Sequence, residues 1–191
     1  MNLELLAQLN QFYFREARLL DERLYQQWQA LLSNNIEYFV PARHVPQLDN
    51  SKRETEAFLN REQEFSNQLQ IGVEPPIRDE QYLHLMIRIM RSLKVVAWSE
   101  NPPARTRRNV SNVELISEHG NQLMVYSNTL LYYSRHEHDE HLYSYQRRDV
   151  LEKFALEKKA LDKNESDFKI LRREVLLDNG VVPAASAALF F

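Results

Sequence analysis

The sequence predicts an α+β fold. Apolar side chains recur at helical spacing near the start of the chain. After Pro102 and Pro103, apolar and polar side chains alternate instead, as they do in half-buried strands. Because the helices come first and the strands follow as a block, helices packed on an antiparallel sheet are favoured over alternating β–α–β units.

Two helices are expected at the start. In the first, over residues 3–20, the apolar stripe consists of Leu5, Leu9, Phe12 and Leu19. Asp21 is a candidate cap of the second helix. The residues that share one face of this second helix are Leu24, Trp28, Leu31 and Leu32. Asn34 and Asn35 are expected to end it.

A short strand over residues 36–40 is expected next. Residues 44–70 are polar and predict a long connection, with some helical character near residues 54–69. Asp79 is a candidate cap of a third helix. The apolar residues that recur at helical spacing in this third helix are Leu83, Ile87 and Met90.

The second half of the chain predicts strands joined by tight turns. Gly120–Asn121 indicates a hairpin turn, and the polar residues 136–141 indicate another. Two more strands are expected over residues 142–153 and 168–177, with a charged connection over residues 158–167. The residues that mark one face of the strand between the two turns are Leu123, Val125, Leu131 and Tyr133.

Composition limits the class of protein. The 191 residues suit a single domain spanning 1–191, with 43% hydrophobic and 27% charged residues. No apolar run approaches the roughly 20 residues that cross a bilayer, and the first residues lack the pattern of a signal peptide. The net charge of −3 argues against a nucleic-acid-binding role. With no cysteine, the chain has no disulfide, thiol nucleophile or cysteinyl metal site.

The most informative segment covers residues 96–115, in which an acidic loop with two prolines leads into three closely spaced arginines and a strand. Its letters W-S-E-N-P-P-A-R-T-R resemble the W-S-E-x-P-P-S-R-T-R motif of the small (β) subunit of aromatic-ring-hydroxylating dioxygenases. Further stretches resemble the same family in the same order, namely residues 14–28, 36–43, 127–135, 145–151, 176–178 and 189–191.

This resemblance implies a cystatin-like or ketosteroid-isomerase-like cone, with N-terminal helices packed on a strongly curved, mostly antiparallel sheet. It implies a non-catalytic structural subunit in a bacterial cytoplasmic hexamer of three α and three β subunits, with β subunits forming a trimer. The partner α subunit would hold a Rieske [2Fe-2S] cluster and a mononuclear Fe(II). Ferredoxin and reductase would act through the α subunit. Catalytic, cofactor-binding and metal-binding residues are expected to be absent from this chain.

Charged clusters within the expected strands predict ion pairs. Alternation places Arg105 and Arg107 on one face and Arg108 on the other. Pairs with carboxylates, within the subunit or across a subunit boundary, are favoured over phosphate binding. The segments 147–149 and 172–174 repeat the theme and suit either a partner-covered or a solvated sheet face.

The segment 136–141 (H-E-H-D-E-H) contains residue types that bind zinc, copper or nickel, but a solvated turn is the favoured interpretation. Core or interface packing is favoured over a ligand-stacking cavity for five tyrosines, namely Tyr126, Tyr132, Tyr133, Tyr143 and Tyr145. The apolar ending 189–191 is expected to dock, either under its own sheet or against another subunit. The candidate subunit-interface residues are Trp98, Arg105, Arg107, Arg147, Leu189, Phe190 and Phe191.

Two alternatives stay open at this stage. A cone-shaped α+β domain could be a stand-alone isomerase or dehydratase, which would use a buried acid or base and tyrosine donors inside the cone. Residues of suitable types are Asp21, Tyr25, His84 and Tyr126. The other alternative is a module that binds a small ligand in the same cavity without an acid or base.

Overall fold

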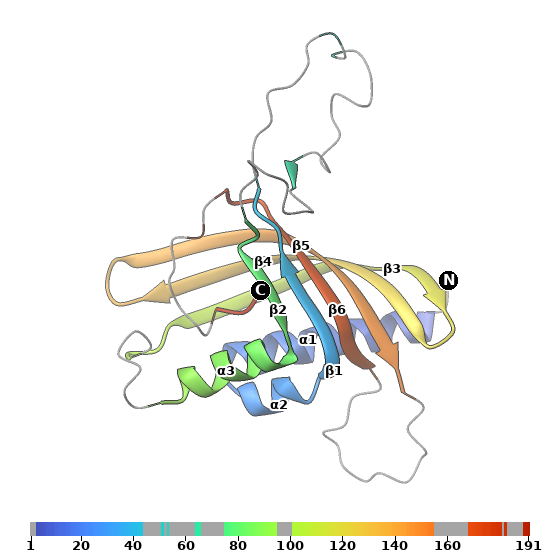
Figure 1. The fold of residues 1–191 in the computed structure, drawn as a ribbon, viewed down its shortest axis with the longest axis horizontal. Helices are drawn as coiled ribbons and strands as arrows, with labels where there is room; N and C mark the ends of the chain where they lie inside the picture. Colours follow the sequence, from blue (N-terminus) through green and yellow to red (C-terminus); the bar gives the residue numbers. More distant parts are fainter. Residues whose placement is uncertain are drawn as a thin grey trace.

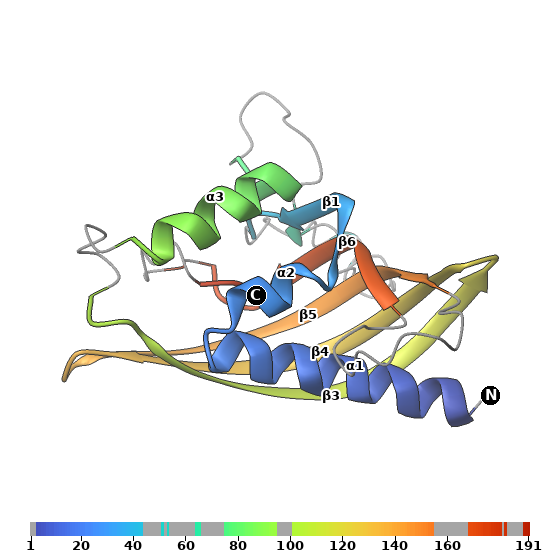
Figure 2. The ribbon, with the colours of Figure 1, turned by 90° about the horizontal axis from the view of Figure 1, so that it is seen from below.

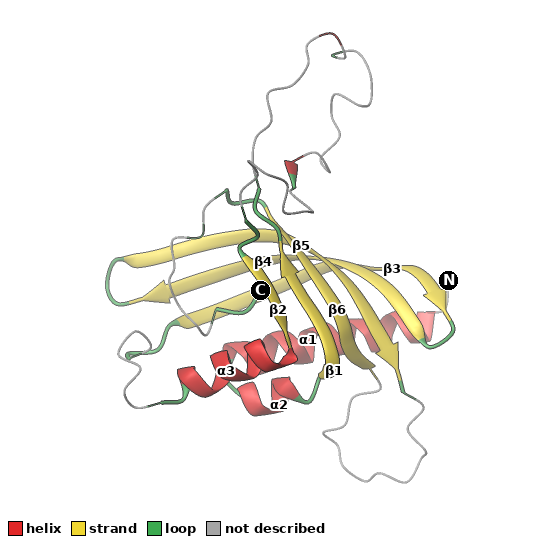
Figure 3. Cartoon of the chain, in the orientation of Figure 1, coloured by secondary structure: helices red, strands yellow, loops and turns green. Residues whose placement is uncertain are grey.

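Helices and a strongly twisted sheet make up the protein, as the computed structural model shows (Figures 1 and 3). The structure describes residues 3–43, 51, 53, 64–65, 75–94, 101–154, 168–180, 182 and 189–191. Within them the elements follow the order α1–α2–β1–β2–α3–β3–β4–β5–β6. The prediction of an α+β fold, with helices packed on a curved sheet, is therefore confirmed.

The helices line the concave side of the sheet. α1 spans Leu3–Asp21, α2 spans Tyr25–Gln29 and α3 spans Tyr82–Ser92. α1 runs along β3 and β4, while β1 and β6 curl over α2 from the other side (Figure 2). The C-terminal end of the chain lies in the space between these two parts of the sheet (Figure 2). No helix within the described ranges is both long enough and apolar enough to cross a membrane.

The described strands form one six-stranded sheet in the order β2-β1-β6-β5-β4-β3. Their bounds are Leu32–Val40 (β1), Arg78–Gln81 (β2), Arg105–His119 (β3), Gln122–Arg135 (β4), Asp139–Lys153 (β5) and Phe168–Leu177 (β6). β1 and β6 pair in parallel, and the other neighbouring strands pair antiparallel. The expected β3–β4 hairpin is confirmed, and Gly120 in its turn has a φ of +63°, which glycine adopts without strain. The turn between β4 and β5 is shorter than expected, because strand β5 already begins at Asp139.

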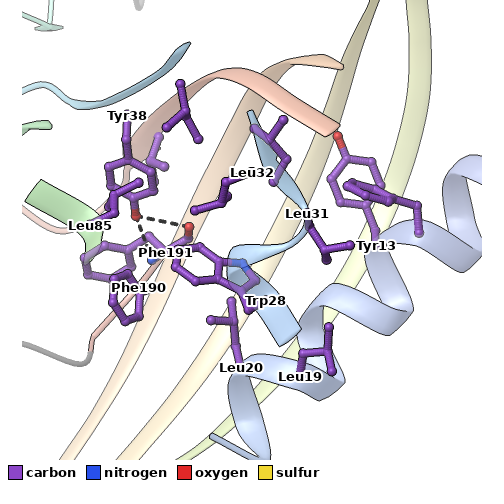
Figure 4. Packing of buried hydrophobic residues seen from close by; sticks show 14 of the residues in the cluster. Tyr13, Leu19, Leu20, Trp28, Leu31, Leu32, Tyr38, Leu85, Phe190 and Phe191 are labelled. Carbon is purple, nitrogen blue, oxygen red and sulfur yellow. Dashed lines mark hydrogen bonds between the residues drawn. The ribbon is translucent and has the colours of Figure 1, made fainter. Parts of the chain in front are cut away.

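The core lies between the helices and the inner face of the sheet. The apolar stripe predicted for α1 is buried, as are the predicted inner-face residues of β4. Figure 4 shows how Trp28 of α2 packs between α1 and the two phenylalanines at the C-terminal end of the chain. The ring centroids of Trp28 and Phe190 are 4.6 Å apart. The core therefore packs the N-terminal helices α1 and α2 against the C-terminal residues 189–191.

Near the start of the chain, the observed limits of α2 and β1 differ from the predicted ones. α2 has only five residues, and the chain enters strand β1 at Leu32, so Asn34 and Asn35 lie within a strand. Asp21 ends α1 and does not cap α2, whose N-cap residue is Leu24. The side chain of Asp21 instead binds β3, and this long-range contact could not be read from local spacing.

The third helix was placed correctly, but its cap and its buried face were not. Asp79 lies in β2, and Gln81 is the N-cap residue of α3. The predicted apolar stripe faces outward, with Leu83, Ile87 and Met90 exposed by 67%, 53% and 61%. Spacing reveals that residues share a face but not which face meets the core, and here the buried residues are Leu85, Arg88 and Ile89. Most of residues 44–70, and all of residues 158–167, lie outside the described residues.

Candidate functional site

Four charged side chains form a cluster in the interior, between α1 and the inner face of β5 and β6. The cluster consists of Glu16, Arg147, Asp149 and Arg173, whose side chains are at most 1% exposed. Arg173 donates to both oxygens of Glu16 at 2.6 and 3.0 Å, and Arg147 donates to Oε2 of Glu16 at 3.0 Å. Arg173 also donates to both oxygens of Asp149 at 2.9 and 2.7 Å. Two cations therefore balance two anions inside the protein.

Two neutral donors add to the cluster. The indole Nε1 of Trp28 donates to Glu16 at 3.1 Å, and the hydroxyl of Tyr13 donates to Asp149 at 2.9 Å. Buried charges are tolerated when they are both paired and hydrogen-bonded, because burial removes their hydration. The cluster therefore fastens α1 and α2 to two central strands.

Local sequence pattern explains how Glu16, Arg147 and Asp149 reach the interior. Glu16 follows Phe12 by four residues on α1, so it lies on the buried stripe of that helix. Arg147 and Asp149 alternate with Tyr145 along β5, which directs all three side chains to the same inner face. Glu16 was not among the residues predicted to be functional, although a glutamate on the apolar stripe of the first helix is a signal that the sequence contains.

Electrostatics fixes the protonation states of Glu16 and Tyr13 near neutral pH. Burial alone would raise the pKa of Glu16, but the charges of Arg173 and Arg147 outweigh it and lower this pKa to about 2. Burial, followed by the negative charge of Asp149, raises the pKa of Tyr13 well above its ordinary value. Neither group is suited to exchange a proton near neutral pH, as general acid–base catalysis requires.

The C-terminal tail 189–191 occupies the space inside the cone. Leu189, Phe190 and Phe191 are 4%, 0% and 2% exposed. The main-chain N–H of Phe191 donates to the hydroxyl of Tyr38 at 2.8 Å, and this hydroxyl lies 3.1 Å from the main-chain oxygen of Phe191 (Figure 4). The rings of Tyr143 and Tyr145 each meet the ring of Phe191 edge-on, with centroids 5.5 Å apart. The prediction that the tail docks is confirmed, and it docks under its own sheet.

Three arginines bind the successive main-chain oxygens of this tail. Arg88 of α3 donates to Leu189 at 2.6 Å. Arg108 of β3 donates to Phe190 at 2.5 Å, and Arg173 of β6 donates to the main-chain oxygen of residue 191 at 3.4 Å. Each arginine is also paired with a carboxylate, and these pairs are Arg88–Glu80, Arg108–Asp21 and Arg173 with Glu16 and Asp149. Charge-assisted bonds of this kind hold a chain segment firmly in place.

The residues considered for a stand-alone enzyme do not converge on one site. Asp21 accepts hydrogen bonds from Thr106 and from the main-chain N–H of Arg108. Tyr25 packs against the tail, and the side chain of His84 accepts the N–H of the residue that caps α3. Tyr126 lies on the outer face of β4, on the other side of the sheet. These four residues therefore do not form the active site of an isomerase or dehydratase.

The candidate subunit-interface residues lie in different environments in the single chain. Arg147 and the tail 189–191 are buried within the single chain, so their side chains offer no surface to a partner. Arg105 and Arg107 are exposed, and Arg108 is buried on the opposite face, as alternation along β3 predicted. The expected ion pair within the subunit is confirmed for Arg108, which binds Asp21. Trp98 lies outside the described residues.

The histidine-rich turn does not assemble a metal site. His138 is 95% exposed and lies 4.0 Å from Glu137. The side chain of His141 lies 2.8 Å from Asp139, and its ring lies 5.9 Å from the ring centroids of Tyr133 and Tyr143. Across the described ranges, no group of three or more histidine, aspartate or glutamate side chains is arranged to hold a metal ion.

The five tyrosines divide between the two faces of the sheet. Tyr133, Tyr143 and Tyr145 are at most 2% exposed and belong to the core, which confirms the packing role predicted for them. Tyr126 is half-buried on the outer face, under the guanidinium of Arg148, and Tyr132 is 41% exposed there.

Comparison with known proteins gives consistent matches over the chain. A family model described as ring hydroxylating beta subunit matches residues 15–184. The beta subunit of benzene 1,2-dioxygenase from Pseudomonas putida is 30% identical, over 99% of this chain and 90% of that protein. The beta subunit of biphenyl 2,3-dioxygenase from Rhodococcus jostii is 28% identical, over 96% of this chain and 87% of that protein.

Solved structures share the fold. A chain of naphthalene 1,2-dioxygenase superposes with a TM-score of 0.74 at 16% identity, covering 100% of this chain and 88% of that chain. ActVI-ORFA from Streptomyces coelicolor superposes with a TM-score of 0.52 at 13% identity, covering 91% of this chain and 98% of that chain. At these identities the likeness concerns the fold alone.

Proposed function

Because this chain belongs to the family of ring-hydroxylating β subunits, we propose that it is the structural subunit of the terminal oxygenase of an aromatic-ring-hydroxylating dioxygenase. In this proposal three copies of the chain and three α subunits form a hexamer. The hexamer adds both atoms of O₂ to an aromatic ring. The electrons come from NAD(P)H and reach the α subunit through a reductase, with or without a ferredoxin.

The occupied interior of the cone is the observation that carries the proposal. Residues 189–191 are buried there, and three arginines bind their main-chain oxygens. The central carboxylates, Glu16 and Asp149, are committed to arginines rather than open to a substrate. An interior of this kind supports a rigid scaffold that holds other subunits.

The composition supports placing the metal centres in the partner. A Rieske cluster needs two cysteine and two histidine ligands, and this chain has no cysteine. We therefore assign the [2Fe-2S] cluster and the mononuclear Fe(II) to the α subunit, together with the choice of substrate. The chain contributes to an oxidoreductase without catalytic residues of its own, as one domain over residues 1–191 in the cytoplasm.

The names of the relatives support an aromatic hydrocarbon as substrate. They are β subunits of dioxygenases named for benzene, biphenyl and chlorobenzene. The assembled complex is therefore expected to act in the catabolism of such compounds, with a cis-dihydrodiol as product.

Co-expression tests the proposed function. The partner is a neighbouring reading frame that contains C-x-H…C-x-x-H, and purification uses a tag on this chain alone. We expect an iron-containing complex of both chains that oxidises an aromatic hydrocarbon when reductase and NAD(P)H are supplied. An iron-free monomer that turns over an isomerase or dehydratase substrate would contradict the proposal.

A further inference from the structure

One asparagine of the chain is followed directly by glycine, and it lies just beyond strand β6. This pair is Asn179–Gly180, whereas every other asparagine precedes a residue that has a side chain. Asparagine is thermolabile because the main-chain nitrogen of the next residue can attack its side-chain carbonyl carbon. A side chain on that next residue hinders the attack, but glycine does not, and its backbone turns freely. The sequence therefore favours this reaction at Asn179.

The surroundings of Gly180 leave room for the attack. Strand β6 ends at Leu177, so Gly180 lies beyond the hydrogen-bonded ladder, where it is exposed. Among the residues that the structure describes, none accepts a hydrogen bond from the main-chain N–H of Gly180. A methyl group at its Cα would meet no described atom within 4 Å. Solvent can therefore reach the nitrogen that attacks.

The side-chain carbonyl of Asn179 is held by strand β5. The main-chain N–H of Ser144 donates to Oδ1 of Asn179 at 3.4 Å. When the nitrogen of Gly180 attacks Cγ, negative charge develops on this same oxygen, and a donor aimed at such an oxygen stabilises the transition state. Hydrogen bonds of this kind are often long before the reaction and shorten as the charge forms. The fold therefore assists the reaction and does not protect the asparagine.

We propose that Asn179 deamidates spontaneously in the folded protein, and that the negative charge so formed loosens the end of β6. The main-chain nitrogen of Gly180 loses its proton to solvent base and bonds to Cγ of Asn179, which forms a succinimide ring. The bond between Cγ and Nδ2 breaks, and the amide group leaves as ammonia after taking a proton from water. Water then opens the ring at either carbonyl and gives aspartate or isoaspartate at position 179. No oxidant or reductant takes part.

The new carboxylate would lie beside an anchor of the C-terminal segment. Asp178 pairs with Arg43 at 2.9 Å and accepts the hydroxyl of Ser144 at 2.7 Å. Arg43 also pairs with Glu64, so this guanidinium already serves two carboxylates. A further negative charge next to Asp178 repels it, and isoaspartate also lengthens the main chain at this point. We therefore expect the contact between Asp178 and Ser144 to weaken, where the chain leaves β6 for the buried tail.

Ageing of the purified full-length chain tests the site. The chain is incubated at mildly alkaline pH, and peptide mass spectrometry follows the conversion of each asparagine. We expect Asn179 to convert at least about tenfold faster than any other asparagine. The matched variant is Gly180→Ala, whose methyl group fits without a clash, and it should convert about tenfold more slowly than the wild type. Circular dichroism checks that this variant is folded.

Comparison with the unfolded chain separates the fold from the dipeptide. In urea Asn179 is still followed by Gly180 but loses the hydrogen bond from Ser144. We therefore expect the folded chain to convert at least as fast as the chain in urea. Much slower conversion in the folded chain, or conversion of Gly180→Ala at the wild-type rate, would overturn the proposed site.

Hydrogen exchange tests the effect on β6. The main-chain N–H of Asp178 donates to the main-chain oxygen of Ser144 at 2.8 Å, so its exchange reports on this end of the strand. Asn179→Asp introduces the charge at once, and we expect roughly twofold faster exchange of this amide, as for a like-charge pair near a protein surface. The control Asn179→Gln stays neutral and should leave the exchange unchanged. Equal exchange in the two variants would contradict the proposed loosening.

Discussion

Glu16 on α1 and Arg173 on β6 bind each other through two parallel hydrogen bonds of 2.6 and 3.0 Å in the interior of the protein. They are separated by 157 positions in the chain. Their contact joins the first helix to the last strand, next to the buried tail. Removing either partner leaves a buried charge without compensation, so the pair should be critical for stability.

Replacing the carboxylate of Glu16 tests this directly. Glu16→Gln keeps the shape of the side chain but leaves Arg147 and Arg173 without their shared anion. We expect a loss of about 3–5 kcal/mol in the free energy of unfolding, measured by urea titration at neutral pH. The matched control is Glu22→Gln, at an exposed carboxylate in the turn directly after the same helix, with an expected change below about 0.5 kcal/mol. Equal effects of the two substitutions would show that the cluster does not stabilise the fold.

The same carboxylate predicts how stability depends on acid. The pKa of Glu16 is about 2 in the folded protein and 4.5 as its ordinary value. Between these pH values the unfolded chain binds a proton at this position and the folded chain does not, so the stability is complete above pH 4.5 and falls as the pH drops toward 2. The expected contribution is roughly 3 kcal/mol. Urea titrations across this range should show a shallower dependence for Glu16→Gln, and an unchanged slope would contradict the assignment.

The tail should stabilise the fold through its central phenylalanine. Phe190 packs against Trp28 and lies under the guanidinium of Arg88, which is 4.2 Å from the ring centroid. Phe190→Ala is expected to cost about 3–5 kcal/mol in thermal or urea unfolding, because it leaves a cavity at the centre of the core. As a control, Phe154→Ala removes a ring that is 39% exposed and should cost about 0.5 kcal/mol. A small effect at Phe190 would show that the tail is not an integral part of the core.

Asp21 should hold the start of β3 against α1. Its carboxylate accepts the main-chain N–H of Arg108 at 2.8 Å and the hydroxyl of Thr106 at 2.9 Å, and it pairs with the guanidinium of Arg108. In Asp21→Asn the charge is lost, so we expect faster hydrogen exchange of the Arg108 amide and of its neighbours in β3. Exchange in β6 should be unchanged, and it serves as the internal control. Uniform acceleration over the whole sheet would indicate global rather than local opening.

Periodicity was sufficient to predict most strands. The segment 168–177 was predicted with its observed limits, because a two-residue alternation identifies a half-buried strand directly. Periodicity was insufficient for α3, which has apolar residues on two faces, and only the packing shows that Leu85 and Ile89 face inward. The partners of Arg147 and Arg173 could not be predicted either, since Glu16 lies more than a hundred residues away in the sequence.

The candidate subunit-interface residues also show what alternation along a strand can and cannot predict. Alternation separated Arg105 and Arg107 from Arg108, and the structure confirms this division. Alternation could not predict that Arg147, on the inner face of β5, is buried and ion-paired. A charged residue on a strand can face solvent, contact a partner subunit or pair with a buried counter-ion, and its position in the strand does not distinguish these cases. The tail residues 189–191 were expected to be buried, either under their own sheet or against another subunit. Only the folded structure shows that they are buried under their own sheet.

The mass and the metal content of the purified complex test the central claim most directly. The claim is that this chain is a scaffold for metal-containing partners. Native mass spectrometry of the co-expressed complex should show three copies of this chain with three copies of the iron-containing subunit, and all iron should remain with that subunit after the two are separated. A chain that stays alone in the presence of the partner and carries out a reaction by itself would contradict the account.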